Sequence, residues 1–354
     1  MALTILSVAY PFAPVGPDAV GGAEQILSEI DSALTRAGHR SIVVACEGSG
    51  VAGIHVPVPR APRLLGPGAR RLAHENHRHA IATALDRWDI DVVHLHGLDF
   101  HAYLPPPGPA ALVTLHLPVT WYPPECLRPA RPQTWFNCVS RSQHANCPGS
   151  LRLLDPIENG VAETFLAARH AKRRFALTLS RICPEKGIHL AIDAAKHAGI
   201  PLLIAGEVFP YQAHQRYFAE LIAPRLDRWR RFIGPVRLAR KRRLLAAARC
   251  VLIPSLAAET ASLVAREALA AGTPVIAFAR GALVEALDHG RTGFLVENEA
   301  QMARAIARLD EIDPARCRQA ARERFSSGQM LRSYVAAYRA LRTAEVDHAA
   351  KGAA

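Results

Sequence analysis

The chain has 354 residues, 50% of them hydrophobic and 21% charged, and its formal net charge is +12. This composition excludes intrinsic disorder and collagen-like or low-complexity sequence, because those classes lack apolar residues or show a strong compositional bias. No stretch approaches the roughly 18 uncharged apolar residues of a membrane span, and the first ten residues lack the features of a signal peptide. We therefore expect a cytoplasmic protein of two domains, at about 150 residues each.

The positive charge lies in one half of the chain. Residues 1–165 carry 12 basic and 14 acidic side chains, a net charge of −2, whereas residues 166–354 carry 31 and 17, a net charge of +14. A basic half is typical of a protein that binds a phosphate-bearing substrate, a nucleic acid or an anionic membrane. Basic segments such as 237–243 are usually solvated surface. The segments 60–79 and 237–243 also fit peripheral contact with an anionic membrane at the inner face of the cell. Neither interleaves aromatic side chains as a nucleic-acid stacking platform does, so we predict no nucleic-acid partner.

Seven cysteines are scattered along the chain, and none is separated from another by two residues, the spacing of zinc or redox pairs. In a cytoplasmic protein this arrangement is typical of reduced thiols with mostly structural roles.

Predicted strands and helices alternate through the first half. An apolar strand over 4–9 is followed by a loop containing Pro and Gly and by a helix that ends at Gly38. The other predicted elements are a helix around 70–85 and strands at 41–45, 92–95, 111–115 and 135–139. Strands alternating with helices favour a parallel sheet flanked by helices.

The second half repeats this alternation. Its predicted strands lie at 176–179, 201–205, 231–233, 251–254 and 274–278, and its predicted helices at 188–198, 215–226, 239–248 and 262–271. After Glu299 the pattern is helical to about residue 345. The chain is therefore predicted to be an α/β protein with two Rossmann-like, doubly wound domains. Their expected bounds are 1–165 and 166–325, with a linker within 159–174, a final helix at 326–345 and a disordered tail at 346–354.

Ligands of open parallel sheets bind at the carboxyl ends of the strands, where the N-termini of helices present free N–H groups. Two such sheets facing each other form a central cleft. The residues that directly follow strands are therefore the candidates for function.

The segment 251–278 carries the strongest of these candidates. Glu259 lies in the loop after a predicted strand, and Glu267 lies on the next helix, with seven residues between them. Ser262 is expected to cap this helix and to leave N–H groups of its first turn able to bind an oxyanion. These donors are the N–H groups of Leu263, Val264 and Ala265.

This segment resembles the donor-site signature of the retaining glycosyltransferases of family 4, which have the GT-B fold. The signature is an acidic residue, seven further residues, a second Glu and the run Ala-Leu-Ala-Ala-Gly-Thr-Pro-Val. Other stretches resemble the same family in the same order. They are Gly21 to Glu24, Arg36 to His39, the strand VVHLH from Val92, Ser180-Arg181-Ile182, Pro184-Glu185-Lys186-Gly187 and the run GRTGFL from Gly290.

The resemblance implies an enzyme that transfers a sugar from a nucleotide-diphosphate donor to an acceptor hydroxyl with retention at the anomeric carbon. It implies that the second domain binds the donor and the first the acceptor, and that the terminal helix crosses back to the first domain. It also implies that neither a cofactor nor a metal ion is needed. UDP-, GDP- and ADP-sugars stay open as donors, and a glycan, a lipid-linked glycan or a small metabolite as acceptor.

The residues that the resemblance assigns to the donor fit the chemistry of a departing diphosphate, which needs cations and oriented N–H dipoles. Arg181 and Lys186 would supply the cations. Glu267 would accept hydrogen bonds from the ribose hydroxyls, because a carboxylate binds a vicinal diol well. Glu259 would contact the donor sugar near its reacting face.

Two features of the first domain resemble the family as well. Gly22, next to Gly21, would let the backbone approach the diphosphate or the sugar, since it has no side chain. His116 follows a predicted strand and resembles the acceptor-domain His that touches the donor sugar. His94 and His96 fall on one face of a strand, where core packing explains them.

Two departures from the family pattern bear on the donor more than on the reaction. The run Thr260 to Val264 follows Glu259 where many members have Pro-Phe-Gly-Leu-Val, and Ser180 replaces the usual Gly before Arg181. Two alternatives stay open: a nucleotide-sugar epimerase with a similar donor domain, and a basic nucleic-acid-binding protein.

Asp89 and Asp91 superficially match the metal-binding acidic pair of the other glycosyltransferase fold. Because they directly precede a predicted strand, a structural role at the start of that strand is the simpler interpretation. We predict no metal site.

Overall fold

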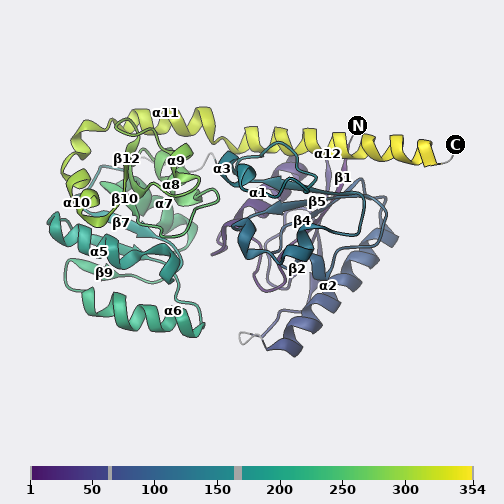
Figure 1. The fold of residues 1–354 in the computed structure, drawn as a ribbon, viewed down its shortest axis with the longest axis horizontal. Coiled ribbons are helices and arrows are strands. Elements are labelled where there is room, and N and C mark those ends of the chain that lie inside the picture. Colours follow the sequence, from purple (N-terminus) through teal and green to yellow (C-terminus); the bar gives the residue numbers. More distant parts are fainter. Residues whose placement is uncertain (1, 63–65, 163–169, 353–354) are drawn as a thin grey trace. The chain divides into compact units, whose positions relative to one another are not determined.

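The computed structural model describes residues 2–62, 66–162 and 170–352. The chain divides into two compact units (Figure 1). Unit 1 comprises Met1–Glu158 and Gly328–Ala354, and unit 2 comprises Asn159–Ser327. Each unit is an α/β fold with a six-stranded sheet and a hydrophobic core of its own.

The sheet of unit 1 has the order β3-β2-β1-β4-β5-β6, and all neighbouring strands are parallel. The order reverses between β1 and β4, which is the topological switch point of a doubly wound sheet. The strands are β1 (Thr4–Val8), β2 (Arg40–Cys46), β3 (Ile54–Val58), β4 (Val92–Leu95), β5 (Ala110–Leu115) and β6 (Thr134–Cys138). The helices and short turns are α1 (Gly22–Arg36), α2 (Pro67–Arg87), η1 (Phe100–Ala102), η2 (Val119–Trp121), η3 (Pro124–Leu127), α3 (Arg141–Ala145) and most of α12 (Ser327–Gly352).

The sheet of unit 2 has the order β12-β11-β10-β7-β8-β9, again all parallel, with its switch point between β7 and β10. The strands are β7 (Ala176–Leu179), β8 (Leu202–Ala205), β9 (Arg230–Phe232), β10 (Cys250–Ile253), β11 (Val275–Phe278) and β12 (Gly293–Val296). The helices are α5 (Ile188–His197), α6 (Gln212–Tyr217), α7 (Leu238–Ala247), α8 (Leu263–Ala270), α9 (Leu283–Ala286), α10 (Glu299–Ala307) and α11 (Pro314–Arg324). The short turns are η4 (Pro184–Lys186), η5 (Phe218–Ile222), η6 (Ala223–Arg225) and η7 (Leu309–Glu311).

The inner strands of both sheets are almost entirely buried. All residues of β5 and of β10 are buried, because helices cover both faces of a parallel sheet. The strands therefore consist of nearly continuous apolar runs. This pattern, and the helical spacing between the runs, explains why the doubly wound class was predictable from sequence.

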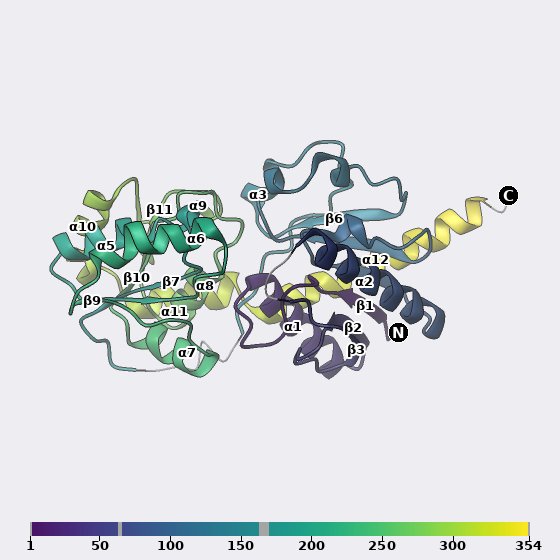
Figure 2. The same cartoon turned by 90° about the horizontal axis from the view of Figure 1, so that it is seen from below.

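The C-terminal helix α12 runs along unit 1 and packs against its sheet (Figures 1 and 2). The Tyr338 hydroxyl lies 2.7 Å from Nδ1 of His94, and the Asn137 amide donates to the Tyr334 hydroxyl at 3.2 Å. Both tyrosine rings are fully buried. The helix continues to Gly352, where a disordered tail was expected from residue 346, and residues 353–354 lie outside the described part of the chain.

The two segments that join the units lie side by side in unit 2. Val161 pairs with Ser326 in a parallel bridge, and its N–H donates to the Phe325 carbonyl at 2.7 Å. Arg266 of α8 is buried, donates to the Asn159 carbonyl and places its guanidinium 4.6 Å from the centre of the Phe325 ring. The predicted linker 159–174 therefore begins in a fixed position, and its residues 163–169 lie outside the described residues.

Three elements differ from the sequence-based predictions. Two edge strands were not predicted: β3, where Pro57 cannot donate to a ladder, and β12, which begins within the run GRTGFL. The helix predicted at 215–226 starts at Gln212 and, after Tyr217, changes to the π turn η5 and the 3₁₀ turn η6. Pro224 lies in η6, where its ring removes an N–H donor and prevents a regular α-helix.

Candidate functional site

The strands on either side of the switch point of unit 2 each lead into a loop with a charged residue. Lys186 follows β7 and Glu259 follows β10, and the parallel pairing of these strands brings their carboxyl ends to one edge of the sheet. Nζ of Lys186 lies 2.5 Å from Oε1 of Glu259. The side chains are 25% and 11% exposed, so part of the pair faces solvent. The structure thus brings together two residues that the sequence analysis assigned to the same site.

Glu259 is held as a carboxylate by its neighbours. Burial raises its pKa, but the charge and hydrogen bond of Lys186, a hydrogen bond from Ser255 and the charge of Arg181 together lower the pKa below its ordinary value. Arg181, which follows β7, therefore acts electrostatically on the same group as Lys186. Ser255, which follows β10 directly, was not singled out from the sequence.

A glycine allows the loop after β7 to pack closely against the end of β10. Gly187 has a φ of 59°, and a Cβ at this position would collide with the Pro254 carbonyl. The N–H groups of Leu256 and Ala257 donate to the Glu185 carbonyl at 2.8 and 3.3 Å. Both loops of the candidate site are therefore held by backbone contacts, which fixes the positions of their charged side chains.

The start of α8 lies at the same edge of the sheet. Ser262 is the N-cap residue, but it has a left-handed backbone with φ 49°, and its side chain makes no capping hydrogen bond. Its carbonyl accepts the N–H of Ala265 at 3.1 Å, so the prediction that this N–H is free to bind an anion was wrong. Leu263 and Val264 are thus the first-turn N–H donors that this helix can offer to an anion.

Glu267 lies in the middle of α8 and is buried, with 3% of its surface exposed. Its Oε1 lies 2.6 Å from Nζ of Lys241 on α7, while its Oε2 is buried and has no hydrogen-bond partner among the described residues. Burial raises the pKa of Glu267 above its ordinary value and outweighs the opposing charge and hydrogen bond of Lys241. The carboxylate is thus poorly satisfied by the protein alone.

Lys241 is a residue whose role the sequence analysis missed. The run 237–243 was interpreted as a solvated or membrane-facing surface, but Lys241 is buried. Its spacing contained a signal, because Lys241 lies three residues after Leu238 and four before Leu245 and so falls on the apolar face of α7.

In unit 1, His116 follows β5 and contacts His96, which follows β4. Nε2 of His116 lies 3.0 Å from Nδ1 of His96, and the two rings are stacked with centroids 5.2 Å apart. Burial lowers the pKa of His116 to about 4, so its imidazole is neutral at neutral pH. Burial and the neighbouring imidazoles also lower the pKa of His94 and of His96. His116 can therefore donate or accept a hydrogen bond but brings no charge.

Gly21 and Gly22 lie at the start of α1, after β1. Gly21 is the N-cap with φ −83°, so it is not required by an unusual backbone conformation. A Cβ at Gly21 would instead collide with the carboxylate of Glu24, which is buried against it. The Gly-Gly-Ala-Glu stretch is thus at least partly a packing feature of this helix start.

Of the acidic pair Asp89 and Asp91, the second residue has a structural role. Oδ2 of Asp91 accepts the N–H of Thr4 at 2.7 Å, and its Oδ1 lies 3.6 Å from Nη1 of Arg342 on α12. This carboxylate links β1, the segment before β4 and the C-terminal helix.

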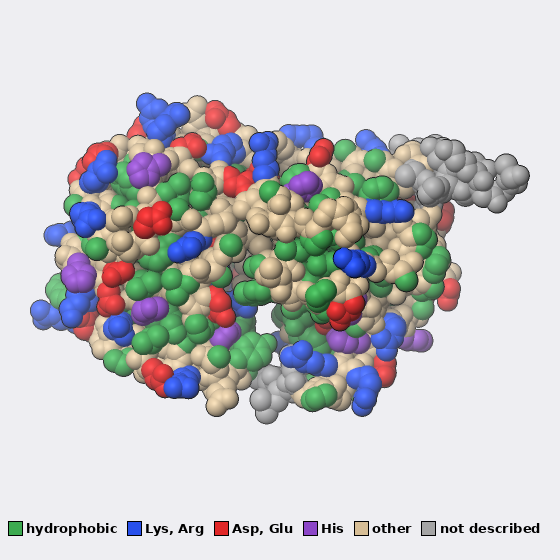
Figure 3. Space-filling view, viewed as in Figure 1, with side chains coloured by type: hydrophobic (Ala, Val, Ile, Leu, Met, Phe, Trp, Pro, Cys, Tyr) green, Lys and Arg blue, Asp and Glu red, His purple; other side chains and the backbone are tan. Residues whose placement is uncertain are grey.

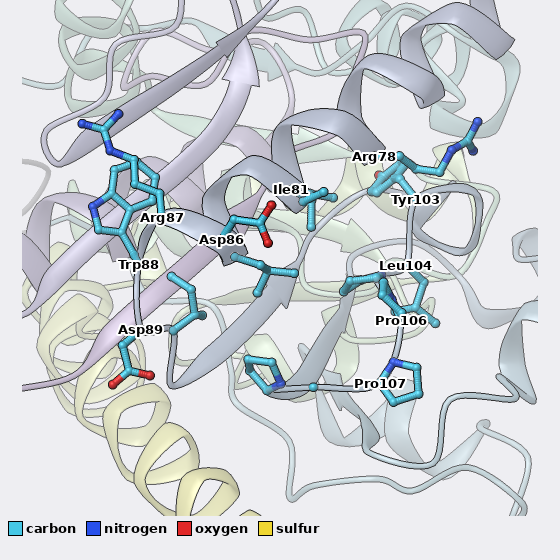
Figure 4. Close-up of a pocket in the computed structure, with 16 residues that line it drawn as sticks. Arg78, Ile81, Asp86, Arg87, Trp88, Asp89, Tyr103, Leu104, Pro106 and Pro107 are labelled. Atoms are coloured by element: carbon cyan, nitrogen blue, oxygen red, sulfur yellow. The ribbon is translucent and has the colours of Figure 1, made fainter.

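A cavity of about 730 Å³ in unit 1 lies apart from the candidate residues. It is lined by the C-terminal part of α2 and by segments 88–90 and 103–109 (Figure 4). These segments lead into the amino ends of β4 and β5, whereas His116 follows the carboxyl end of β5. Arg87 covers the Trp88 ring, with its Cζ 4.7 Å from the ring centre. None of the residues that the sequence analysis assigned to the donor or its sugar lines this cavity.

The basic side chains of unit 2 do not form one continuous patch on the face shown in Figure 3, where they alternate with acidic ones. Several are ion-paired at the surface, such as Arg225 with Asp193 at 3.2 Å and Arg308 with Glu311 at 2.7 Å. In the described part of the chain, the helices lack the combination of length and apolar character that crossing a bilayer requires.

Comparison with known protein families identifies the chain. Residues 164–324 match the family described as Glycosyl transferases group 1, and residues 20–148 match Glycosyltransferase Family 4. The first match contains the loops after β7 and β10, and the second contains Gly21 and His116. The chain belongs to the group 1, family 4 type of GT-B glycosyltransferases. This family favours sugar transfer over the epimerase alternative.

Solved structures with low sequence identity share the fold of this glycosyltransferase. The sucrose-phosphate synthase of Thermosynechococcus elongatus has a TM-score of 0.76 at 19% identity, over 96% of this chain and 100% of that one. AviGT4, a glycosyltransferase involved in avilamycin A biosynthesis, has a TM-score of 0.71 at 24% identity, over 97% and 98% of the two chains. HepE of Anabaena, in complex with UDP and glucose, has a TM-score of 0.72 at 19% identity, over 96% and 100%.

Among curated proteins, a D-inositol 3-phosphate glycosyltransferase of a Nocardioides species is 43% identical over 93 residues. That match spans 26% of this chain and 20% of the relative's own length.

Proposed function

We propose that this protein transfers a sugar from a nucleotide-diphosphate donor to an acceptor hydroxyl, with retention at the anomeric carbon, and that unit 2 binds the donor. The observation that carries this proposal is the contact between Lys186 and Glu259 at the carboxyl ends of the two strands beside the switch point. A doubly wound sheet binds its ligand at this place.

The arrangement suits a departing diphosphate. Lys186 and Arg181 supply positive charge, and the first turn of α8 offers the N–H groups of Leu263 and Val264 to phosphate oxygens. Lys186 is balanced by Glu259 before the donor arrives, so the lysine is held in position at the edge of the sheet. Charge that develops on the leaving diphosphate in the transition state is then stabilised by groups that need no rearrangement.

The two glutamates have different tasks in this proposal. Glu259 stays ionised and accepts hydrogen bonds from hydroxyls of the donor sugar. Glu267 accepts a ribose hydroxyl at its Oε2, which has no hydrogen-bond partner within the described residues. A hydroxyl donor at this atom would remove the cost of a buried, unsatisfied acceptor.

The presence of UDP with glucose in one HepE structure, and of UDP-glucose in another, supports a UDP-sugar as the donor. We also propose that His116 acts as a neutral hydrogen-bonding group rather than as a base. A pKa lowered to about 4 leaves the ring uncharged at neutral pH and makes it a weak proton acceptor. The acceptor is a glycan, a lipid-linked glycan or a small hydroxylated metabolite.

The proposal is tested by incubating the full chain with a panel of UDP-, GDP- and ADP-sugars and measuring nucleotide binding and nucleotide release. We expect binding and slow release with one nucleotide class, and faster release once a suitable acceptor is added. Folded protein that neither binds nor turns over any member of the panel would refute the proposal.

The stereochemistry and the metal requirement are tested on the same reaction. Proton NMR of the first product formed should show the anomeric configuration of the donor, since the opposite configuration would exclude retention. Turnover should persist after exhaustive treatment with EDTA. A loss that Mg²⁺ or Mn²⁺ restores would exclude a metal-independent reaction.

A further inference from the structure

Three potential metal ligands from two separate segments meet beside the candidate donor site. Cys183 and Glu185 belong to the loop after β7, and His214 belongs to α6. Three ligand atoms lie within 4.8 Å of one another: the Cys183 sulfur, a Glu185 carboxylate oxygen and an imidazole nitrogen of His214. We propose that these three side chains form a binding site for Zn²⁺.

The distances are close to what a zinc ion needs. Tetrahedral zinc with bonds of about 2.0 to 2.3 Å holds its ligand atoms about 3.3 to 3.6 Å apart. Rotamer adjustments of roughly an ångström bring three atoms within 4.8 Å to that spacing. Cys183 is preceded and followed by fixed backbone, because its carbonyl accepts the Lys186 N–H at 3.1 Å. Zinc binding therefore requires rotamer changes of the ligand side chains and no movement of the loop backbone.

The surroundings of the ligands support the assignment. The Nδ1 atom of His214 is buried and has no hydrogen-bond partner among the described residues. The His214 ring packs edge-on against Tyr211, with centroids 5.1 Å apart, which restricts its orientation. The Cys183 thiol is buried, and burial together with its hydrogen bond to the Glu185 side chain raises its pKa to about 11, so zinc must displace the thiol proton when it binds.

The ligand set selects the metal. A thiolate is a soft ligand that Mg²⁺ and Ca²⁺ do not favour, whereas one Cys, one His and one carboxylate suit zinc. Three protein ligands leave a fourth position for water, as in open zinc sites. A thiolate and a carboxylate neutralise the two charges of the ion, so the nearby Arg181 and Lys186 face a site with no net charge.

Zinc bound here would link η4 to α6, which are in contact in unit 2. It would therefore stabilise the loop that carries Lys186. The inference rests on the coordinates of these residues and not on the proposed function, because sugar transfer by Lys186 and Glu259 does not require the ion.

Titration with Co²⁺ under reducing conditions, after removal of other metals, tests the site. The absorption spectrum of bound cobalt depends on the type and geometry of its ligands. We expect one Co²⁺ per chain, with a thiolate-to-cobalt charge-transfer band in the near ultraviolet and intense visible bands of tetrahedral cobalt. Zn²⁺ should displace the cobalt and raise the thermal midpoint of the protein. Absence of the charge-transfer band, or visible bands of octahedral cobalt, would refute the site.

Variants identify the ligands. Cys183→Ser and His214→Ala should each lower zinc affinity by at least about tenfold, measured by competition with a chromophoric chelator. Cys147→Ser is the control, since it removes a thiol of unit 1 that is not among the proposed ligands, and should leave the cobalt spectrum unchanged. If Cys183→Ser folds poorly, His214→Ala decides alone, because this ring lies on a short surface helix. A spectrum that survives in His214→Ala, or that is lost in Cys147→Ser, would place the metal elsewhere.

Discussion

Unit 2 contains two lysine–glutamate pairs that look alike in sequence and differ in their physical state. Lys186 and Glu259 are partly exposed, and the neighbours of Glu259 lower its pKa. Lys241 and Glu267 are 9% and 4% exposed at the side chain, and burial raises the pKa of Glu267. The first pair lies at the edge of a sheet, where both charged groups are partly exposed to solvent. The second pair is buried, and Oε2 of Glu267 has no hydrogen-bond partner among the described residues.

The difference comes from the number of partners. At Glu259, Ser255 and Arg181 lower the pKa together with Lys186. At Glu267, burial raises the pKa by more than the single residue Lys241 lowers it. A buried ion pair contributes little to stability unless further hydrogen bonds satisfy its remaining atoms. The ribose contact proposed for Glu267 would satisfy its remaining oxygen, and the comparison predicts how each pair responds to mutation.

Breaking the buried pair should have the largest effect. Lys241→Met removes the partner of Glu267 and leaves a carboxylate in an apolar site, which should destabilise the protein by about 3 to 5 kcal/mol. Urea unfolding followed by circular dichroism measures this. The double variant Lys241→Met with Glu267→Leu should regain most of the loss, since no charge then stays buried. A loss below about 1 kcal/mol in the single variant would show that the pair is not desolvated.

The exposed pair should affect turnover rather than stability. Lys186→Ala should lower the rate of nucleotide-sugar turnover by more than tenfold, because a cation on the leaving diphosphate acts mainly in the transition state. Steady-state nucleotide release measures the rate. Lys196→Ala, an exposed lysine of α5, is the control and should turn over as the parent protein does. Equal turnover in Lys186→Ala would remove Lys186 from the site.

The fold and the site of Lys186 and Glu259 were predictable from the sequence, whereas the pair of Lys241 and Glu267 was not. Apolar runs separated by helical spacing indicated both doubly wound sheets, and the family resemblance assigned Lys186 and Glu259 to one site. The strand order that brings the carboxyl ends of β7 and β10 side by side was seen only in the structure. The partner of Glu267 was not predicted, because Lys241 lies on a different helix and its basic neighbours suggested a solvated surface. Pairing across α7 and α8 depends on tertiary packing, which local periodicity does not report. The Cys183, Glu185 and His214 group was missed for the same reason.

The role of Glu267 is tested with altered nucleotides. Removing the 2′- or 3′-hydroxyl from the bound nucleoside diphosphate should weaken binding to the parent protein by about tenfold or more, the cost of a hydrogen bond to a charged group. Glu267→Ala should bind the deoxy and the parent nucleotides almost equally. Isothermal titration gives the dissociation constants, and the ratio cancels any general effect of the mutation on unit 2. Unchanged discrimination in Glu267→Ala would exclude contact with the ribose.

The smallest effect, on the order of 1 kcal/mol, is a difference in how pH acts on the two glutamates. The pKa of Glu259 is lowered in the folded protein, so its contribution to stability is present above the ordinary value of 4.5 and is lost as pH falls through the folded pKa. The pKa of Glu267 is raised, so its contribution is complete below 4.5 and is lost as pH rises through the folded pKa. Glu259→Gln should therefore flatten the stability profile below 4.5 and Glu267→Gln should flatten it above 4.5, as measured by urea unfolding across this range. The same change of slope in both variants would show that the two glutamates do not differ in their electrostatic environment.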